Sequence, residues 1–341
     1  MDVDVWTMQP EQDDKTLLAV AIQRGHNAVA QVLYPRMYPT PALILATDLR
    51  VRAAIFGTPN VTVYTASYHG KDVVLKGPKF PNKRIMTEFQ GEVAAMRTAK
   101  SPYLMPLIGF LDNQSAAPHT FKPRGQLYSP TMVMEYMDLG DLHAYIQAKK
   151  HKVPVELDLS TIDVALVLAL ALVDLHARGL IHRDVKSLNI FLSTTHYVRL
   201  GDLGSARTLD TDSVMSSNTG TKYWMAPEVL RVPGHGGEGR PYTTAADIYS
   251  FGVVLTELDT LSEPYSHVPV EKRGAIEENV RLGKLRPKMS ATCLPWLPDL
   301  ANKCLAFNPR ARPTAAAIVD ELLLQRKTKG NASASAGGLP P

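Results

Sequence analysis

Three polar residues stand at short intervals between apolar flanks in the stretch IHRDVKSLNIFL: Asp184, Lys186 and Asn189. Transfer of the terminal phosphoryl group of a nucleotide passes through a loose transition state, so positioning and electrostatics matter more than a strong base. An aspartate can orient a hydroxyl and take its proton late, a lysine can neutralise the moving group, and an amide oxygen can bind magnesium. The spacing therefore predicts phosphoryl transfer. A surface loop with an ion pair remains the alternative when this string is considered alone.

Strand patterns dominate the part of the chain before residue 138. Residues 61–76 alternate apolar and polar side chains around His69-Gly70, which predicts a β-hairpin. Residues 84–99 carry apolar side chains at helical spacing, and 130–137 predict a buried strand that ends near a turn at Gly140. We expect a strand-rich lobe over 48–137.

Helical patterns dominate from 138 to 325, where we expect a second lobe about twice as large. Ser160 and Asp163 predict a capping box, and Gly179 marks the end of the helix that they open. Helices are also predicted over 243–258 and 310–323. A cleft between two such lobes is a natural ligand site.

The two ends of the chain differ from these lobes. Residues 15–34 predict two short helices around Gly25, and the stretch resembles an ankyrin repeat, whose positions are matched by Thr16, Leu18, Ala21, Gly25, His26, Val29, Val32 and Leu33. It departs from that family at Leu17 and Ala19, and a generic amphipathic arm fits as well. One repeat cannot bury its own face, so the hairpin would follow further repeats or pack on the next domain. We expect an ankyrin-like segment over 1–34, a proline-punctuated linker over 35–47 and a disordered tail over 326–341.

Several motifs in order around Asp184 resemble a eukaryotic protein kinase domain over roughly residues 50–325. Lys76 in VVLK matches the lysine that holds the nucleotide phosphates, and Glu92 matches its helix partner. GDLGSAR matches the family's Asp-Phe-Gly motif with Leu203 in place of Phe, which implies Asp202 as the main magnesium ligand. The resemblance implies an α+β bilobal fold, with a small antiparallel-sheet lobe carrying one main helix and a larger, mainly helical lobe.

The resemblance also implies ion pairs that support the site and a set of nucleotide contacts. Glu228 in APE should pair with Arg312, and Asp247 should brace the backbone near Asp184. Cofactors would be ATP and magnesium. The nucleotide would meet the hinge backbone at Glu135 and Met137, the gatekeeper Met134, an apolar sandwich of Val63, Val74 and Phe191, the ribose acceptor Asp141, and Gly57. Each apolar residue in this set could also serve the core alone.

The predicted phosphate-binding lid departs from the family pattern. In IFGTPNVTVY only Gly57 remains, Pro59 cannot donate a backbone N–H, and Val61 stands where another glycine is usual. Fewer donors toward the phosphates predict weaker nucleotide binding, with catalysis retained. The alternative is a pseudokinase that acts as a scaffold.

The acceptor predicted from the resemblance is a serine or threonine hydroxyl of a protein. Lys186 and the Gly220-Thr221 pair match the serine/threonine pattern of the tyrosine-kinase-like group, the Raf and mixed-lineage type. Thr221 would shape the substrate site near Asp184. Ser213, Ser216 and Ser217 are candidates for regulatory phosphorylation, since Arg183 offers a cation to an added phosphate. The APE segment disfavours a small-molecule acceptor.

Composition excludes several other classes of function. The 341 residues carry a formal charge of only +4, without a run of five like charges, which argues against nucleic-acid binding. The two cysteines form no metal-ligand pattern and indicate a reducing compartment. Residues 164–173 are too few for a membrane span, and the start lacks the features of a signal peptide. We expect a cytoplasmic protein whose partners are protein substrates and, through the ankyrin-like segment, other proteins.

Overall fold

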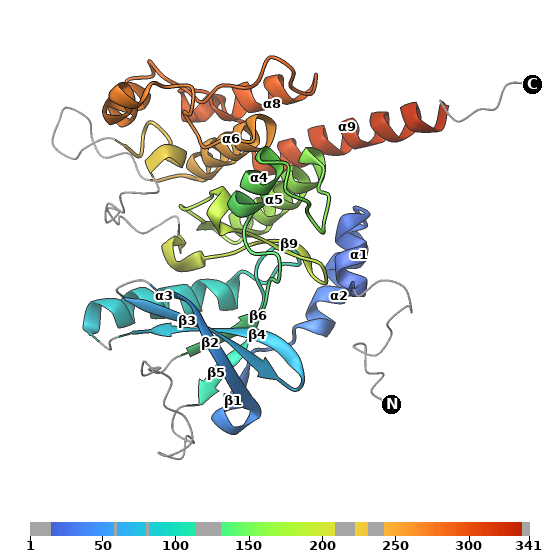
Figure 1. Ribbon diagram of the computed structural model, residues 1–341, viewed down its shortest axis with the longest axis vertical. Coiled ribbons are helices and arrows are strands. Elements are labelled where there is room, and N and C mark those ends of the chain that lie inside the picture. Colours follow the sequence, from blue (N-terminus) through green and yellow to red (C-terminus); the bar gives the residue numbers. More distant parts are fainter. Residues whose placement is uncertain are drawn as a thin grey trace, which may run out of the picture. The chain divides into compact units, whose positions relative to one another are not determined.

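The computed structural model describes residues 15–57, 60–79, 82–112, 131–208, 222–230 and 242–335. The chain forms two compact units (Figure 1). The first, here called the sheet unit, comprises the chain up to Leu139 together with Leu192–Ala206. The second, the helical unit, comprises Gly140–Phe191 and the chain from Arg207 onward. The observed division lies close to the predicted boundary at 137. It differs in that the sheet unit also takes up 192–206 and the residues before 48.

A six-stranded sheet in the order β1-β5-β6-β4-β3-β2 forms the centre of the sheet unit. The predicted antiparallel sheet is present, and β1 adds one parallel pair with β5, which makes the sheet mixed. These two strands are far apart in sequence, and no tight hairpin forces them to run in opposite directions. The strands are β1 (Ala42–Leu45), β2 (Leu49–Gly57), β3 (Val61–Tyr68), β4 (Lys71–Pro78), β5 (Leu107–Asp112) and β6 (Thr131–Glu135).

The predicted hairpin is confirmed as β3 and β4. His69 and Gly70 both have positive φ, 48° and 80°, and join Tyr68 to Lys71 in a two-residue loop. Two central residues with positive φ match the twist of the flanking strands.

One face of the sheet packs in the hydrophobic core, and the opposite face carries the predicted nucleotide-binding residues. Tyr64, Ala66, Val73, Leu75 and Val133 are buried together with Ile44 in one hydrophobic cluster. Side chains alternate along a strand, so the intervening residues lie on the opposite face. That face carries Lys76 opposite Val63, and Val74 opposite Met134.

One long helix, α3 (Lys83–Thr98), supplies the glutamate that faces this sheet. The Asn82 side chain accepts a hydrogen bond from the Ile85 backbone at 2.9 Å and fixes the start of the helix. Phe89 and Met96 are buried on the same stripe as Glu92, because residues three or four apart share one helix face. The helix therefore turns Glu92 inward.

The N-terminal part is more ordered than a hairpin plus linker. Helices α1 (Leu17–Gln23) and α2 (Asn27–Met37) are joined at Gly25, whose φ of 72° confirms the predicted turn. The predicted linker 35–47 is wrong, since it contains the end of α2, all of β1 and a short 3-10 turn. Pro35 lies inside α2 and removes only one backbone donor, which the helix tolerates one turn before its end.

The helical unit is built around the apolar helix α5. Ser160 caps it, since the Ser160 hydroxyl accepts from the Asp163 backbone at 3.3 Å and donates to the Asp163 carboxylate at 2.6 Å. The helices are α4 (Leu142–Lys150), α5 (Thr161–His176), α6 (Thr244–Thr260), α7 (Ile276–Arg281), α8 (Leu297–Cys304) and α9 (Ala315–Ser335).

Short strands and 3-10 helices occur in both units. The short strands are β7 (Leu180–Ile181), β8 (Ile190–Ser193), β9 (Tyr197–Leu200) and β10 (Arg207–Thr208), with β7 paired to β10 and β8 to β9. The 3-10 helices are η1 (Ala46–Asp48), η2 (Ser187–Asn189), η3 (Leu203–Ser205), η4 (Lys222–Trp224), η5 (Val270–Ala275) and η6 (Pro309–Ala311).

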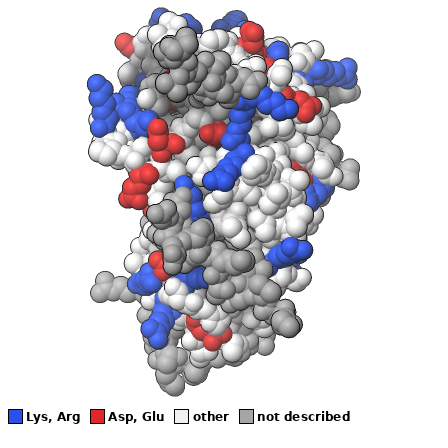
Figure 2. Space-filling model, turned by 90° about the vertical axis from the view of Figure 1, so that its right-hand side faces the viewer, with Lys and Arg blue, Asp and Glu red and all other residues white. Residues whose placement is uncertain are grey.

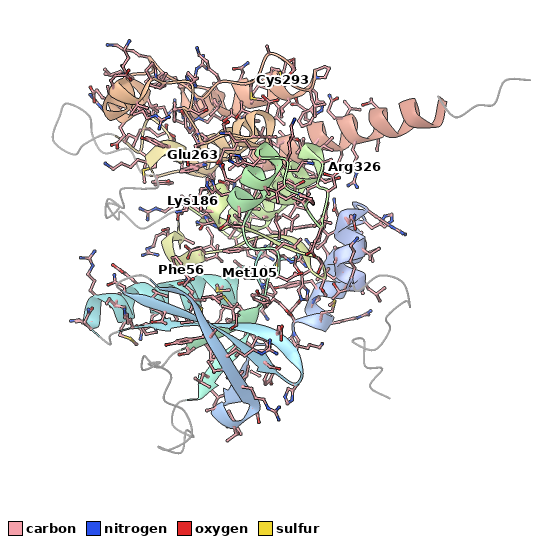
Figure 3. All side chains as sticks on the ribbon, viewed as in Figure 1. Phe56, Met105, Lys186, Glu263, Cys293 and Arg326 are labelled. Carbon is pink, nitrogen blue, oxygen red and sulfur yellow. The ribbon has the colours of Figure 1, made fainter. Side chains whose placement is uncertain are left out.

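Helix α9 is longer than predicted. It continues to Ser335, so the prediction of disorder from 326 is wrong for the first ten residues of that tail. Arg326, labelled in Figure 3, lies 3.4 Å from the Asp163 carboxylate. Residues 326–335 include no proline, the residue that most strongly breaks a helix.

No helix in the described part of the chain is long and apolar enough to cross a bilayer. On the face drawn in Figure 2, lysine and arginine side chains are interspersed with acidic and uncharged surface.

Candidate active site

Lys76 joins two carboxylates within the sheet unit. Its Nζ lies 2.6 Å from Oε1 of Glu92 and 2.9 Å from Oδ1 of Asp202. Burial alone would lower the pKa of Lys76, but the charges of Asp202 and Glu92 outweigh it and raise that pKa. Burial raises the pKa of Glu92, and Lys76 opposes this shift. The lysine is therefore held as a cation on the sheet face that carries Val63 and Val74.

The backbone at Asp202 has an unusual conformation. Asp202 lies in the left-handed region with φ 59°, which is uncommon outside glycine and typical of functional turns. A Cβ on Gly204 would lie 3.3 Å from the Asp202 carboxylate and 3.4 Å from that of Glu92, so a larger residue there would press on both. Leu203 is buried, as a core role requires of the residue that replaces the family's phenylalanine.

Asp184, Lys186 and Asn189 also lie together, within the helical unit. Lys186, labelled in Figure 3, places its Nζ 2.8 Å from Oδ2 of Asp184. The Asn189 amide nitrogen donates to the Asp184 carbonyl at 2.8 Å and to the same Oδ2 at 2.9 Å. Oδ1 of Asp184 is buried and has no hydrogen-bond partner among the described residues. One carboxylate oxygen is thus fixed, and the other is left to accept.

Asp247 of α6 supports the backbone that carries Asp184, as predicted. Its carboxylate accepts from the backbone N–H groups of His182 at 2.9 Å and Arg183 at 2.8 Å. His176 lies 2.9 Å from the same carboxylate. Asp247 is fully buried, so these partners compensate its lost hydration and fix the loop.

The predicted pairing of Glu228 with Arg312 is confirmed. Two parallel contacts of 2.6 and 2.8 Å join the guanidinium to the carboxylate. Arg312 also donates to the carbonyls of Ala306 and Ala245. The bidentate geometry makes this a well-satisfied buried ion pair, which anchors the end of the APE segment.

Sequence reasoning missed a second buried carboxylate of α6, which lies next to the loop that carries Asp184. Glu257 of α6 accepts from the Ser187 hydroxyl and from the Trp224 indole, each at 2.7 Å. Burial raises its pKa to about 7, although both hydrogen bonds act to lower it. A glutamate within the apolar run of residues 243–258 was the available signal.

The predicted nucleotide contacts are described in part. Met134 and Met137 are buried, and β6 ends at Glu135. Asp141 pairs with Phe191 in an isolated bridge, and its side chain caps α4 by accepting from the Ala144 backbone at 2.8 Å. Gly57 ends β2 opposite Thr62. Further residues that the predictions name lie outside the described part of the chain. Among them are Pro59 in the lid, Thr221 at the substrate site, and the candidate phosphorylation sites Ser213, Ser216 and Ser217.

A polar cluster behind Glu135 was also missed. Nε2 of His196 lies 3.0 Å from the Glu135 carboxylate. Burial alone would raise the pKa of Glu135, but His196 and Tyr38 lower it. Arg199 is only 1% exposed, and its Nε and Nη2 have no hydrogen-bond partner in the described part of the chain. Charged residues inside the apolar strands TMVME and YVRL were the signal.

Each of the two groups, taken by itself, offers an oxygen atom of the kind that magnesium binds. Asn189 uses its amide nitrogen for Asp184, which leaves its carbonyl oxygen for a cation, and the Asp202 side chain is 40% exposed. Magnesium is often bound by only one or two protein oxygens, with water and phosphate completing its shell. The described residues contain no group of three or more His, Cys, Asp or Glu that could hold a metal by itself.

Comparisons with known proteins agree with the geometry. The sequence profile of the protein kinase domain matches residues 60–324. The chain is 30% identical over 266 residues to serine/threonine-protein kinase STY17 of Arabidopsis thaliana, which covers 76% of this chain and 41% of that protein. It is 31% identical to serine/threonine/tyrosine-protein kinase HT1 of the same plant, over 75% of this chain and 61% of HT1. It is 31% identical to serine/threonine-protein kinase A-Raf of Sus scrofa, over 81% and 43%. The matched part is thus less than two thirds of each relative.

Proposed function

The chain belongs to the protein kinase family, and on that premise we propose that it transfers the terminal phosphoryl group of ATP to serine and threonine hydroxyls of protein substrates. The similar proteins named above are serine/threonine kinases by name, and HT1 is also named for tyrosine. Lys186 and the resemblance to the Raf-like group favour serine and threonine.

The observation that carries the proposal is the unequal use of the two Asp184 oxygens. Oδ2 is held by Lys186 and Asn189, while Oδ1 is buried without a partner among the described residues. A buried carboxylate oxygen without a partner is costly unless a ligand satisfies it. A substrate hydroxyl that donates to Oδ1 would be oriented for attack and could pass its proton to Asp184 as the phosphoryl group transfers.

The remaining residues would bind the nucleotide and screen its charge. Lys76, held by Glu92, would contact the phosphates, and Lys186 would neutralise the moving group. Asp202 and Asn189 would each offer an oxygen to magnesium, which supplies charge neutralisation on the phosphates when bound. In the proposed site the base would bind the backbone of the hinge residues.

The intact ion pairs argue for catalysis over the scaffold alternative. A pseudokinase has no need to keep a buried lysine between Glu92 and Asp202, nor an aspartate with one partnerless oxygen. The reduced lid is expected to weaken nucleotide binding, because donors to phosphates that do not transfer hold the ground and transition states similarly.

Two finer proposals concern the chain's setting. We propose that the α1–α2 hairpin is an ankyrin-like unit that contacts a protein partner through Val29 and Val32, which α2 exposes. The free cysteines Cys293 and Cys304 suit a reducing compartment, which supports a cytoplasmic location.

Phosphate incorporation from labelled ATP into a generic protein substrate tests the proposed function. Asp184→Asn should lower the rate by roughly a hundredfold or more, because the amide can no longer take the proton. Asp158→Asn is the matched control, since Asp158 is an 81% exposed aspartate of the same unit, and its rate should stay near that of the wild type. Phosphoamino-acid analysis of the product should give phosphoserine and phosphothreonine. Tight Mg·ATP binding with no transfer above the Asp184→Asn background would favour the scaffold.

A further inference from the structure

The residues before the kinase match contact the rest of the sheet unit at three places. We call residues 16–45 the N-terminal arm, which comprises α1, α2 and β1 and lies wholly outside the matched range 60–324. Each attachment meets an element that carries part of the proposed nucleotide site.

The first attachment is strand β1. It pairs in parallel with β5, with Ala42 opposite Gly109, and Ile44 is 1% exposed in the cluster that also holds Val133 of β6. A Cβ on Gly109 would lie 2.5 Å from the Ala42 carbonyl oxygen and 2.7 Å from Ile44 Cδ1. Real Cβ atoms do not approach backbone oxygen so closely, so β1 can dock here because residue 109 is glycine.

The second attachment leads to β9, the strand that precedes Asp202. The Thr16 backbone donates to the Thr195 carbonyl at 3.1 Å, and α1 packs against β9. The Tyr103 hydroxyl donates to the Asn27 side chain at 3.0 Å. The Tyr103 carbonyl in turn accepts from the Leu200 backbone at 2.9 Å. The arm thus contacts both the start of β9 and, through Tyr103, its end.

The third attachment reaches the hinge. Tyr38, directly after α2, is buried, and burial together with the negative charge of Glu135 raises the pKa of its hydroxyl; the Glu135 carboxylate contacts His196. Arg199 lies in the same buried cluster, and Glu135 is the carboxylate in this cluster that offsets its charge. Glu135 has its backbone in the proposed adenine contact, its side chain is held by His196, and Tyr38 brings the arm close to it.

We propose that the N-terminal arm is a positioning element of the nucleotide site, which holds β6 at the hinge and β9 before Asp202 in their binding geometry. The inference rests on the proposed function, because it assigns the arm to the same site. Binding groups must be held within a fraction of an ångström by the residues behind them, so loosening either strand weakens nucleotide binding. Asp184 belongs to the helical unit and the arm to the sheet unit, so chemistry on bound nucleotide should change less.

Two variants of the 341-residue chain separate the arm from general folding effects. Gly109→Ala should displace β1, and its matched control is Gly274→Ala, where an added Cβ meets nothing within 4 Å. Tyr103→Phe removes the hydroxyl that donates to Asn27 of α2 and leaves β1 in place, so it keeps the test open if Gly109→Ala does not fold. Its control is Tyr68→Phe, the same change on β3.

The readouts are the KM for ATP, kcat, and hydrogen exchange of amides 133–137 and 198–202 without nucleotide. Both arm variants should raise the KM by roughly two- to tenfold, the factor that one net hydrogen bond is worth, with a smaller change in kcat. They should also speed amide exchange at the two strands, while the controls match the wild type.

Two outcomes would overturn the inference, and they are distinguishable. Wild-type protein that neither binds Mg·ATP nor transfers phosphate refutes the proposed function and this inference with it. Active wild-type protein, with KM and amide exchange unchanged in folded Tyr103→Phe and Gly109→Ala, refutes the positioning role alone.

Discussion

Replacement of Glu257 by glutamine should change how the stability of the helical unit depends on pH. The Glu257 carboxylate is 1% exposed and accepts hydrogen bonds from Ser187 and Trp224. Its pKa is raised from 4.5 to about 7, and burial is the largest cause. Glutamine has the same shape and cannot ionise, so it reproduces the size of the protonated acid at every pH.

The sign and size of the effect follow from proton binding. The folded state holds the Glu257 proton more tightly than the unfolded chain, so this group contributes most to stability below about pH 4.5, and the contribution is lost as pH rises to about 7. A pKa unit corresponds to about 1.4 kcal/mol, so the full change is about 3 kcal/mol. Relative to wild type, Glu257→Gln should therefore gain stability between pH 4.5 and 8 by that order.

Urea unfolding followed by circular dichroism at several pH values measures this difference directly. The free energy of unfolding of the wild type should fall below the Glu257→Gln curve as pH rises, while Glu271→Gln, a change at an exposed glutamate, should track the wild type. Parallel wild-type and Glu257→Gln curves from pH 4.5 to 8 would refute the reasoning, because they would show that the acid has the same proton affinity in both states.

Two further variants probe packing around the site. Arg312→Lys cannot keep both contacts to Glu228, so it should lower the free energy of unfolding by about 3 kcal/mol, as measured in urea, and a loss below 1 kcal/mol would contradict this. Gly252→Ala places a Cβ 2.8 Å from Cys304 Cβ in the buried contact of α6 and α8, and should cost about 1–3 kcal/mol by overpacking. Gly274→Ala serves as its control, and equal melting temperatures for these two alanine variants would show that the contact relaxes freely.

The parts of the fold that could be predicted obey local rules. The β3–β4 hairpin follows from alternation and a two-residue turn, and the start of α5 follows from Ser160 as a cap. The lysine–glutamate pair of Lys76 and Glu92 required more, because the partners lie on a strand and a helix. There the resemblance to a kinase domain supplied the pairing that local patterns cannot.

The parts that could not be predicted depend on contacts between distant segments. Strand β1 reads as a linker in sequence because four residues carry too little pattern, and its place is set by Gly109, far along the chain. Disorder after residue 325 is predicted from the lack of apolar residues there. That lack decides whether the segment packs, but it does not decide whether the segment forms a helix.

Buried charges explain why some site residues could be foreseen and others could not. A charge in an apolar run must find a partner when it is buried, so such a residue predicts a distant contact without naming it. For Arg312 a motif named the partner, whereas nothing named partners for Glu135, Arg199 and Glu257. Glu135 ends β6 at the hinge, Arg199 belongs to the strand before Asp202, and Glu257 accepts from Ser187 in the loop that carries Asp184. The cost of burying a charge without a partner makes these residues effective at fixing the elements that they join. Displacing one of two joined elements would leave a charge without its partner.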